Sequence, residues 1–344
     1  MTGGWFQYLV VFVSSSILCL FLVPLTIRIS WRVGLLDHPR GYKRQESPVP
    51  YLGGMAITFA FTLAIISASL THPPVAGRRE LNVILITALA LAVVGLLDDI
   101  KNVSPWVRIA VEVGCGIVVW NLGVGVSLTG LDLLDLLLTV FWVVGITNAF
   151  NLLDNMDGLT AGVVCTTCTS YFAVAATGGQ FLVAAMSAGL VGCAVGFLRS
   201  NRYPAQIYMG DGGSLFLGFL VAYLGLKLKV VGDGFQTSVV PVLACSIAIL
   251  DTSVVTVARL RLRKSPFQGG SDHISHRLVK IGLPVPVAVG TIHVVAAIAG
   301  VLAFVCSRLD PISVWIVGGL VGANALGAAG FLLTIPVYPE QQHS

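Results

Sequence analysis

Residues 81–99 read LNVILITALALAVVGLLDD, an apolar run that ends in two adjacent aspartates. The apolar part is about as long as a helix must be to cross the roughly 30 Å hydrocarbon layer of a membrane. Comparable runs recur along all 344 residues, of which 56% are hydrophobic and 10% charged, whereas about 25% of residues are charged in a typical soluble domain. The sequence therefore predicts an all-α polytopic membrane protein.

The apolar runs predict about eleven membrane-spanning helices, or ten if the less regular fourth and fifth are not separate, in one integral membrane domain over residues 1–344. The expected spans are 6–28, 52–70, 81–97, 106–122, 137–153, 160–177, 181–198, 212–229, 238–258, 286–306 and 313–335. The first span continues into a basic loop without a convincing cleavage site, so we expect it to be retained.

The 20 Lys and Arg residues concentrate in alternate connections, which we expect to be cytoplasmic because positive charge stays on the inner side of membranes. This rule places the N-terminus outside. The cytoplasmic connections are then 29–51, 98–105, 154–159, 199–211 and 259–285. Basic residues are dispersed over these connections, so the net charge of +4 reflects topology, and no nucleic-acid partner is expected.

Four polar clusters interrupt the apolar runs, and the predicted topology puts all four on the cytoplasmic face. They are Asp98-Asp99, the series Asn148, Asn151, Asp154 and Asp157, the run GDGGS at 210–214, and Asp272 beside His273 and His276. Carboxylates are costly near hydrocarbon, so acids retained there usually do chemistry or handle ions. Their shared face allows one composite site.

The pair Asp98-Asp99 follows an apolar run, at a helix C-terminus where the helix dipole disfavours negative charge. The next helix has its own start signal in Ser104-Pro105, so the pair is not needed as a cap. A solvated pair of loop acids is the plain alternative. Adjacent carboxylates also suit a divalent cation, or a base beside a metal ligand.

The second cluster repeats every three residues, so neighbouring members share one side of a helix. Over the whole series the direction drifts by about half a turn, and we expect Asp154 and Asp157 to fold over the helix end, with Gly158 permitting the turn. Two amides followed by two carboxylates favour a hard cation and a polar ligand over simple packing.

The run at 210–214 precedes an apolar helix, where Asp211 could act only as an N-cap. Its glycines also permit close approach of a ligand to exposed N–H groups, which attract phosphate oxygens. Tyr208 offers an aromatic face for a base. His273, His276 and Arg277 can donate to phosphate oxygens, and zinc is disfavoured because the surrounding acids suit a hard cation.

Three further predictions concern charged residues outside these motifs. Lys43 and Arg44 form either part of the ordinary inside bias or a basic rim for an anionic lipid or substrate. Asp251 lies within a span, with Arg259 two turns on as its expected partner. Arg108 and Glu112 have the spacing of a helical ion pair and are expected to satisfy each other.

Taken in order, the clusters resemble the motifs of the polyprenyl-phosphate N-acetylhexosamine-1-phosphate transferases, a family that includes the phospho-N-acetylmuramoyl-pentapeptide transferases. The resemblance extends over residues 37–278. It implies transfer of a sugar 1-phosphate from a UDP-N-acetylhexosamine to undecaprenyl phosphate, with release of UMP and with Mg²⁺, or alternatively Mn²⁺, as cofactor. It also implies a cytoplasmic active site in the inner membrane and, in many members, a homodimer.

The resemblance assigns roles by matching motif positions. The catalytic positions are Asp98, as base for the lipid phosphate, Asp99 and Asp154. The metal positions are Asp211 and Asp154. The nucleotide and donor positions are Asn148, Asn151, Asp157, Tyr208, His273, His276 and Arg277, with Asp157 and Tyr208 against uracil. Contacts with the lipid phosphate or the donor are expected from Lys43, Arg44 and Arg259.

Two residues depart from the family pattern. Asn155 stands where the family usually has glycine, and Ser275 replaces the middle histidine of a His-x-His-His motif that marks the N-acetylglucosamine branch. A muramoyl-pentapeptide transferase therefore remains an alternative within the family. An ion-coupled transporter is the alternative from another class, although transporter sites usually lie near the bilayer midplane and between repeats.

Overall fold

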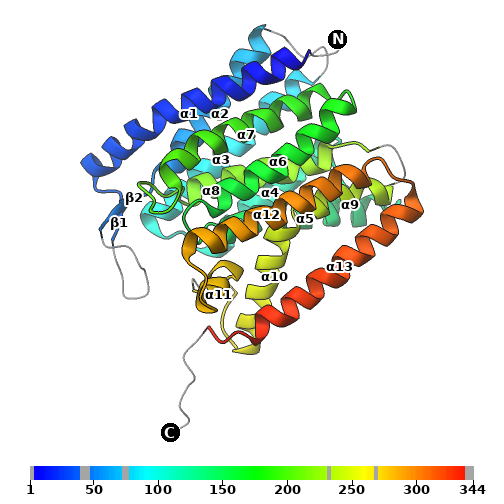
Figure 1. Cartoon of the computed structure of the whole chain (residues 1–344). Helices are drawn as coiled ribbons and strands as arrows, with labels where there is room; N and C mark the ends of the chain where they lie inside the picture. Colours follow the sequence, from blue (N-terminus) through cyan, green and yellow to red (C-terminus); the bar gives the residue numbers. More distant parts are fainter. Residues whose placement is uncertain (1–3, 39–46, 72–76, 231–233, 267–269, 338–344) are drawn as a thin grey trace.

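The computed structural model describes residues 4–38, 47–71, 77–230, 234–266 and 270–337. The described part is helical apart from one short hairpin (Figure 1). Its helices are α1 Trp5–Val33, α2 Gly53–Thr71, α3 Arg78–Lys101, α4 Pro105–Asn121, α5 Asp132–Leu153, α6 Leu159–Thr177, α7 Phe181–Asn201, α8 Asp211–Lys227, α9 Gly234–Ala244, α10 Ser246–Arg261, α11 Ile274–Lys280, α12 Val285–Cys306 and α13 Pro311–Thr334. The hairpin pairs β1 Leu36–Asp37 with β2 Val49–Pro50.

These helices confirm the prediction of an all-α polytopic membrane protein. Within the described ranges, eight helices are long and apolar enough to cross a membrane, or nine if a bent pair counts as one span. The expected fourth and eighth spans correspond to α4 and α8, which have 17 residues each. The exact count of eleven and the orientation stay predictions.

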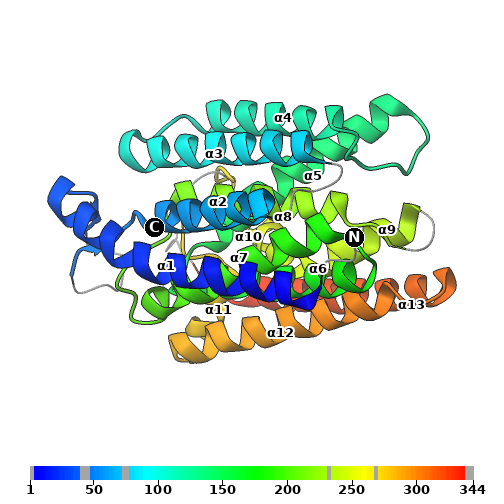
Figure 2. The same cartoon turned by 90° about the horizontal axis from the view of Figure 1, so that it is seen from above.

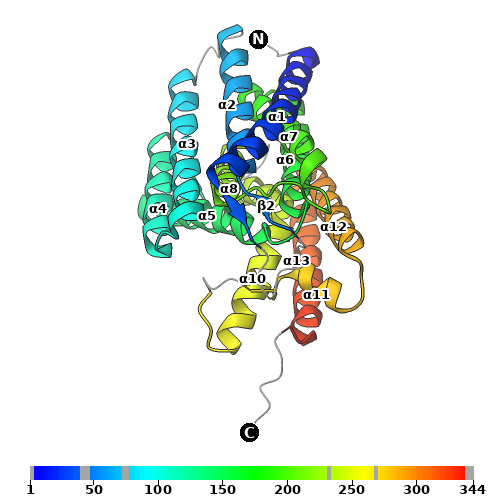
Figure 3. The same cartoon turned by 90° about the vertical axis from the view of Figure 1, so that its left-hand side faces the viewer.

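The expected ninth span is broken in the structure. Its two halves, α9 and α10, meet at an angle of 69° near Cys245. Figure 3 shows that α10 and the short α11 extend beyond the ends of α3 and α4. The break therefore carries the start of the connection at 259–285 beyond the ends of α3 and α4 (Figure 3).

Helix α8 forms the centre of the bundle, between α3 with α4 on one side and α12 with α13 on the other (Figure 2). Every residue from 212 to 225 is buried. A Cβ at Gly95 of α3 would lie 2.3 Å from the backbone oxygen of Asp211. Small residues let membrane helices approach this closely, and the approach sets the end of α3 against the start of α8.

The outer helices present apolar side chains outward. Only 6% of the most apolar stretch of α13 is buried inside the chain, and α1 exposes Trp5, Phe6 and Phe21. A helix that is apolar on all sides is stable in contact with lipid rather than water. The exposed apolar surface agrees with a multi-pass membrane protein.

The hairpin fixes the loop that precedes α8. Leu36 pairs with Pro50, and Asp37 pairs with Val49. The oxygen of Pro50 accepts a hydrogen bond from the N–H of Tyr208 over 2.8 Å, and the Tyr208 oxygen accepts one from the Gly53 N–H over 3.0 Å. Lys43 and Arg44 lie in the connection between the two strands, outside the described residues, so the predicted basic rim stays a prediction.

Candidate active site

The start of α8 is held by a carboxylate from the last turn of α3. Asp99 accepts hydrogen bonds from the N–H groups of Asp211, over 3.0 Å, and Gly212, over 3.3 Å. A negative charge at a helix N-terminus is stabilised by the unpaired N–H groups and by the helix dipole. The expectation that the Asp98-Asp99 pair is not needed as a cap is thus wrong for Asp99, which caps a distant helix rather than the next one.

The glycine before α8 makes this contact possible. Gly210 has φ +72°, in the left-handed region, and an added Cβ would lie 2.7 Å from the Asp99 carboxylate and 2.6 Å from the Tyr51 oxygen. A residue with a side chain would be strained by its backbone and would also push Asp99 away. The GDGGS run is therefore needed for the junction between α3 and α8.

Asp98 and Asp211 share one arginine. The Nη1 atom of Arg108, in the first turn of α4, lies 2.6 Å from Asp98 Oδ2 and 3.2 Å from Asp211 Oδ2. Asp98 also accepts from the Val103 N–H over 2.7 Å. The three side chains join the ends of α3, α4 and α8, so acids 113 positions apart in sequence form one charged group.

The expected pair between Arg108 and Glu112 is not observed. Arg108 Nε and Glu112 Oε1 are both buried without a hydrogen-bond partner in the described structure. Glu112 instead accepts from the Asn148 side chain through its other oxygen. Arg108 and Glu112 have the spacing of a helical ion pair, but they do not form one because the Arg108 guanidinium extends to two carboxylates at the ends of other helices.

The two asparagines of α5 take different positions. Asn151 donates from Nδ2 to Asp211 Oδ1 over 2.8 Å and to Ser214 Oγ over 2.9 Å, so it belongs to the charged group. Asn148 is one turn deeper, where it contacts Glu112 and the Val144 oxygen. The structure brings Asn151 into the site and places Asn148 beneath it.

After Asp154, the chain folds over the end of α5 as expected. Asp157 accepts from the Ala205 N–H over 2.9 Å. Asn201, at the end of α7, accepts from the Gly158 N–H over 3.0 Å and donates to the Ile207 oxygen over 2.9 Å. Asn201 thus ties the aspartate loop, residues 154–158, to the loop before α8.

The acids of the aspartate loop are in an environment that disfavours their charge. Burial, with the negative charges of Asp211 and Asp157, raises the pKa of Asp154 to about 7. Burial also raises the pKa of Asp157, against a smaller lowering by its backbone hydrogen bonds. The pKa of Tyr208 is raised by burial and by the charges of Asp157, Asp37 and Asp154. Perturbed pKa values in a group of acids are typical of functional sites.

The histidine cluster, made up of Asp272, His273 and His276, lies against α10. His273 Nδ1 is 2.7 Å from Asp251 Oδ2, and the other Asp251 oxygen accepts from the Ile274 N–H over 2.7 Å. The His273 and His276 rings are 6.2 Å apart. His276 is half-buried, whereas His273 is buried. The prediction that Asp251 pairs with Arg259 is therefore wrong. The two residues are eight positions apart on α10, which separates them by about 12 Å along the helix, and the loop after α10 instead brings His273 back to Asp251.

Arg259 and Arg277 are enclosed by protein rather than aimed at an open site. Arg259 Nε lies 2.8 Å from Asp272 Oδ2, and both side chains are at most 1% exposed. Arg277 donates from Nη1 to the oxygens of Leu332 and Ile335 at the end of α13. The structure does not bring these two predicted donor contacts into the charged group; their observed partners hold the α11 segment to α10 and α13.

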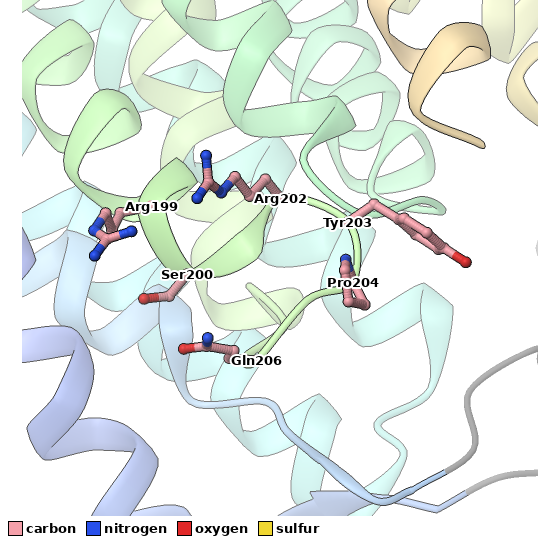
Figure 4. Close-up of a pocket in the computed structure, with 6 residues that line it drawn as sticks. All are labelled: Arg199, Ser200, Arg202, Tyr203, Pro204 and Gln206. Carbon is pink, nitrogen blue, oxygen red and sulfur yellow. The ribbon is translucent and has the colours of Figure 1, made fainter. Parts of the chain in front are cut away.

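A polar hollow of about 380 Å³ lies beside the aspartate loop, at the end of α7 (Figure 4). Its lining residues are Arg199, Ser200, Arg202, Tyr203, Pro204 and Gln206. None of them is a predicted site residue. The hollow is linked to the site through Ala205, whose N–H bonds to Asp157.

The carboxylates of the site could supply only some of the ligands of a Mg²⁺ ion. Across the described ranges, no three His, Cys, Asp or Glu side chains are grouped closely enough to hold a metal by themselves. Mg²⁺ in phosphate-handling enzymes usually takes one or two carboxylates and completes its shell with water and substrate phosphates. Asp211 and Asp154 could fit this pattern, because both are carboxylates and the negative charge of Asp211 raises the pKa of Asp154.

Three polar residues join the site without having been predicted as part of it: Arg108, Ser214 and Asn201. The sequence did contain a signal for Arg108, because a cation lies in the first turn of the helix that follows the Asp98-Asp99 pair. Its spacing of four residues from Glu112 instead favoured an ion pair within that helix. No sequence signal pointed to Asn201, because a polar residue at a helix end is ordinary.

Comparison with known proteins agrees with this geometry. The model of glycosyl transferase family 4 matches residues 81–229, from α3 to just after α8. This segment contains both acid motifs of the charged group and the aspartate loop. The histidine cluster lies beyond it.

Curated relatives extend the similarity to most of the chain. The chain is 29% identical over 320 residues to the probable undecaprenyl-phosphate N-acetylglucosaminyl 1-phosphate transferase of Bacillus subtilis (strain 168), covering 90% of this chain and 87% of that protein. It is 27% identical over 296 residues to the undecaprenyl-phosphate alpha-N-acetylglucosaminyl 1-phosphate transferase of Escherichia coli (strain K12), covering 78% and 77%.

A third relative is the decaprenyl-phosphate N-acetylglucosaminephosphotransferase of Mycobacterium tuberculosis (strain ATCC 25618 / H37Rv), 27% identical over 304 residues, covering 78% of this chain and 75% of that protein. The family match covers the segment that builds the charged group, and the relatives cover the helices around it. The chain is thus similar to glycosyl transferase family 4 over residues 81–229, and to N-acetylglucosaminyl 1-phosphate transferases over most of its length.

Proposed function

We propose that this protein transfers N-acetylglucosamine 1-phosphate from UDP-N-acetylglucosamine to undecaprenyl phosphate, releasing UMP. The names of the relatives agree in a polyprenyl phosphate and N-acetylglucosamine. The observation that carries the proposal is the meeting of Asp98, Asp99 and Asp211 at the N-terminus of α8, with the Arg108 guanidinium between Asp98 and Asp211. Carboxylates at such a junction suit a divalent cation that is completed by substrate phosphates, and an arginine beside them can pair with a phosphate.

In the proposed reaction, a lipid phosphate oxygen attacks the β-phosphorus of the donor. The new bond joins this oxygen to phosphorus, and the bond from the β-phosphorus to the bridging oxygen breaks, so that UMP leaves with that oxygen. Asp98 accepts a proton if the lipid phosphate carries one. A phosphate is already an adequate nucleophile, so direct attack is favoured over a phospho-aspartate intermediate.

Asp211 and Asp154 are the residues that would hold Mg²⁺, with Mn²⁺ as an alternative. When bound, the cation supplies charge neutralisation for the diphosphate and the leaving UMP. Asn151 orients Asp211 through its hydrogen bond of 2.8 Å. Arg108 balances Asp98 and Asp211 when the substrate is absent.

The uridine is proposed to lie along the aspartate loop. Asp157 and Tyr208 lie close enough for the negative charge of Asp157 to raise the pKa of Tyr208. The tyrosine ring would stack on uracil, and His273 and His276 would contact the donor phosphates. The product would start a cell-envelope glycan at the cytoplasmic face of the inner membrane, and a homodimer is the proposed assembly.

The proposal is tested by purified full-length protein with undecaprenyl phosphate and either UDP-N-acetylglucosamine or UDP-MurNAc-pentapeptide, with Mg²⁺ or with EDTA. The expected result is a lipid-linked sugar from UDP-N-acetylglucosamine that requires the divalent cation. Preference for the pentapeptide donor would support a muramoyl-pentapeptide transferase. Movement of UDP-sugar or an ion into proteoliposomes without a lipid product would support a transporter.

A further inference from the structure

The two departures from the family pattern contact each other. Ser275 Oγ, in the first turn of α11, donates a hydrogen bond to Oδ1 of Asn155 in the aspartate loop. The residues are 120 positions apart in the chain. The usual glycine at the first position and histidine at the second could not form this bond, because glycine has no side chain to accept it.

Asn155 is held so that its oxygen points away from α5. Its Nδ2 donates to the oxygens of Leu152, over 2.9 Å, and Leu153, over 3.1 Å, at the C-terminus of that helix. The unpaired oxygens at a helix end need such donors. One side chain therefore closes the end of α5 and presents an oriented acceptor to Ser275.

Ser275 is 1% exposed and lies between the two histidines of the cluster. The same turn is held on its other side by Asp251, which contacts His273 Nδ1 and the Ile274 N–H. Two attachments thus fix the start of α11, one to α10 and one to the aspartate loop. The second attachment is the only one of the two that joins the histidine cluster to the acids.

We propose that Asn155 and Ser275 form a positioning pair that sets the distance between the histidine cluster and the aspartate loop and thereby controls affinity for the nucleotide-sugar donor. This inference rests on the proposed function, in which the donor lies between these segments. Without the pair, the two segments would have to be ordered when the donor binds. That ordering lowers affinity while leaving the acids that perform the chemistry unchanged.

Either residue can be changed to break the same bond. We expect Asn155→Ala and Ser275→Ala each to raise KM for UDP-N-acetylglucosamine by about 5–20-fold, the effect of losing one hydrogen bond in an enclosed site, with kcat within about twofold. The double variant should resemble Asn155→Ala, because Ser275→Ala then removes only a bond that the loss of Asn155 has already broken. Ser275→Thr retains the hydroxyl and should restore most of the affinity.

Two matched controls are available on exposed helix surfaces. Ser253 donates to the Ile249 oxygen in its own helix, and Asn324 donates to the Leu320 oxygen in its own helix. Ser253→Ala and Asn324→Ala remove the same chemical groups from exposed side chains that bond within their own helices. Both should leave KM for the donor unchanged.

Binding of UDP by the full-length protein, measured by calorimetry with Mg²⁺, separates this inference from the proposed function. Weaker binding by both alanine variants, with recovery in Ser275→Thr, supports the pair even if no sugar 1-phosphate is transferred. Unchanged UDP binding and KM in both alanine variants, or additive losses in the double variant, would overturn it while transfer by the wild type stands.

If Ser275→Ala fails to fold, Asn155→Ala breaks the bond from the less buried side. Absence of UDP binding by the wild type would contradict both proposals.

Discussion

The carboxylate of Asp99 accepts a hydrogen bond from the backbone N–H of Asp211 over 3.0 Å. This contact joins the last turn of α3 to the first residue of α8, and it gives Asp99 a structural task in addition to its proposed place beside the lipid phosphate. The two acids cannot be separated without loosening the N-terminus of α8. Substitutions at this junction therefore affect stability and chemistry together.

Asp99→Asn should reduce transfer by at least about 100-fold, because Asp99 holds the backbone of Asp211 and a shift of a site residue by about 1 Å costs this much. It should also destabilise the protein by about 0.3–1 kcal/mol, because the amide oxygen can still accept from the helix N–H groups but lacks the negative charge that the helix dipole stabilises. The rate of lipid-linked sugar formation and the Tm in detergent measure the two effects.

Asp310→Asn is the matched control for this substitution, because Asp310 accepts from the Ile312 and Ser313 N–H groups at the start of α13. It should cost similar stability and leave transfer intact. Near-normal turnover in Asp99→Asn would remove Asp99 from the chemistry and leave it only as a cap.

Arg108→Gln should reduce turnover more than tenfold and destabilise the protein by about 1.5–3 kcal/mol, since hydrogen bonds to charged groups are worth this much. The physical reason is that Asp98 and Asp211 would then face each other without their shared cation. Arg108→Lys should be intermediate, because an ammonium group supplies charge but not the planar geometry. Steady-state kinetics over a range of lipid phosphate concentrations provides the measurement.

Arg261→Gln, at the exposed end of α10, controls for the loss of one positive charge on the same protein. It should change neither turnover nor Tm. Equal losses in Arg108→Gln and Arg261→Gln would show that net charge, and not the link between Asp98 and Asp211, accounts for the effect.

Asp154→Asn should abolish transfer yet raise Tm at pH 8 by roughly 1–3 °C in EDTA. The pKa of Asp154 is raised to about 7, above about 3.9 in the unfolded chain, so the folded state binds the proton more tightly. Wild-type stability therefore falls as pH rises from about 4 to 7, and the full cost of the charge is present above pH 7.

The Tm difference between Asp154→Asn and the wild type should shrink as pH falls from 8 to 5, because the wild-type carboxyl is then protonated. Mg²⁺ should stabilise the wild type more at pH 8 than at pH 6, since a ligand must lose its proton to bind the cation. A variant less stable than the wild type at pH 8 would contradict the strained environment assigned to Asp154.

Arg259→Gln decides between a donor contact and a structural ion pair. Because Arg259 and Asp272 are buried together, removal of one partner should destabilise the protein by about 3–5 kcal/mol, and the folded fraction should retain its KM for the donor. Thermal unfolding and donor kinetics test this. An unchanged Tm with a raised KM would instead favour the donor contact that the sequence predicted.

The apolar runs predicted the helices well because membrane-spanning segments need a continuous apolar length that is visible in the chain itself. The sixth span was expected at 160–177, and α6 is Leu159–Thr177. The ninth span was expected at 238–258 as one continuous helix, and its break was not predicted, because a bend of 69° within a continuous apolar run leaves the hydrophobicity of that run unchanged. The polar motifs were found for the same reason as the helices: they stand out against apolar surroundings.

The partners of the charged residues were much harder to predict. Arg108 and Arg259 were each assigned a partner on their own helix, whereas the structure pairs them with acids from other segments. Helical spacing reports only neighbours within a helix, and the contacts of Asp99 with α8 depend on how closely α3 and α8 pack. The contact between Asn155 and Ser275 likewise depends on how segments far apart in the chain pack together. In the sequence, the two residues were visible only as departures from a motif.

The fate of the β-phosphorus tests the proposed reaction most directly. UDP-N-acetylglucosamine labelled with ³²P at the β-position is incubated with undecaprenyl phosphate, Mg²⁺ and either the wild type or Asp211→Asn. The label should move into the lipid fraction with one UMP released per labelled lipid, and the variant should transfer none. Label that stays in released UDP while the sugar moves, or no labelled lipid from the folded wild type, would contradict sugar 1-phosphate transfer at this site.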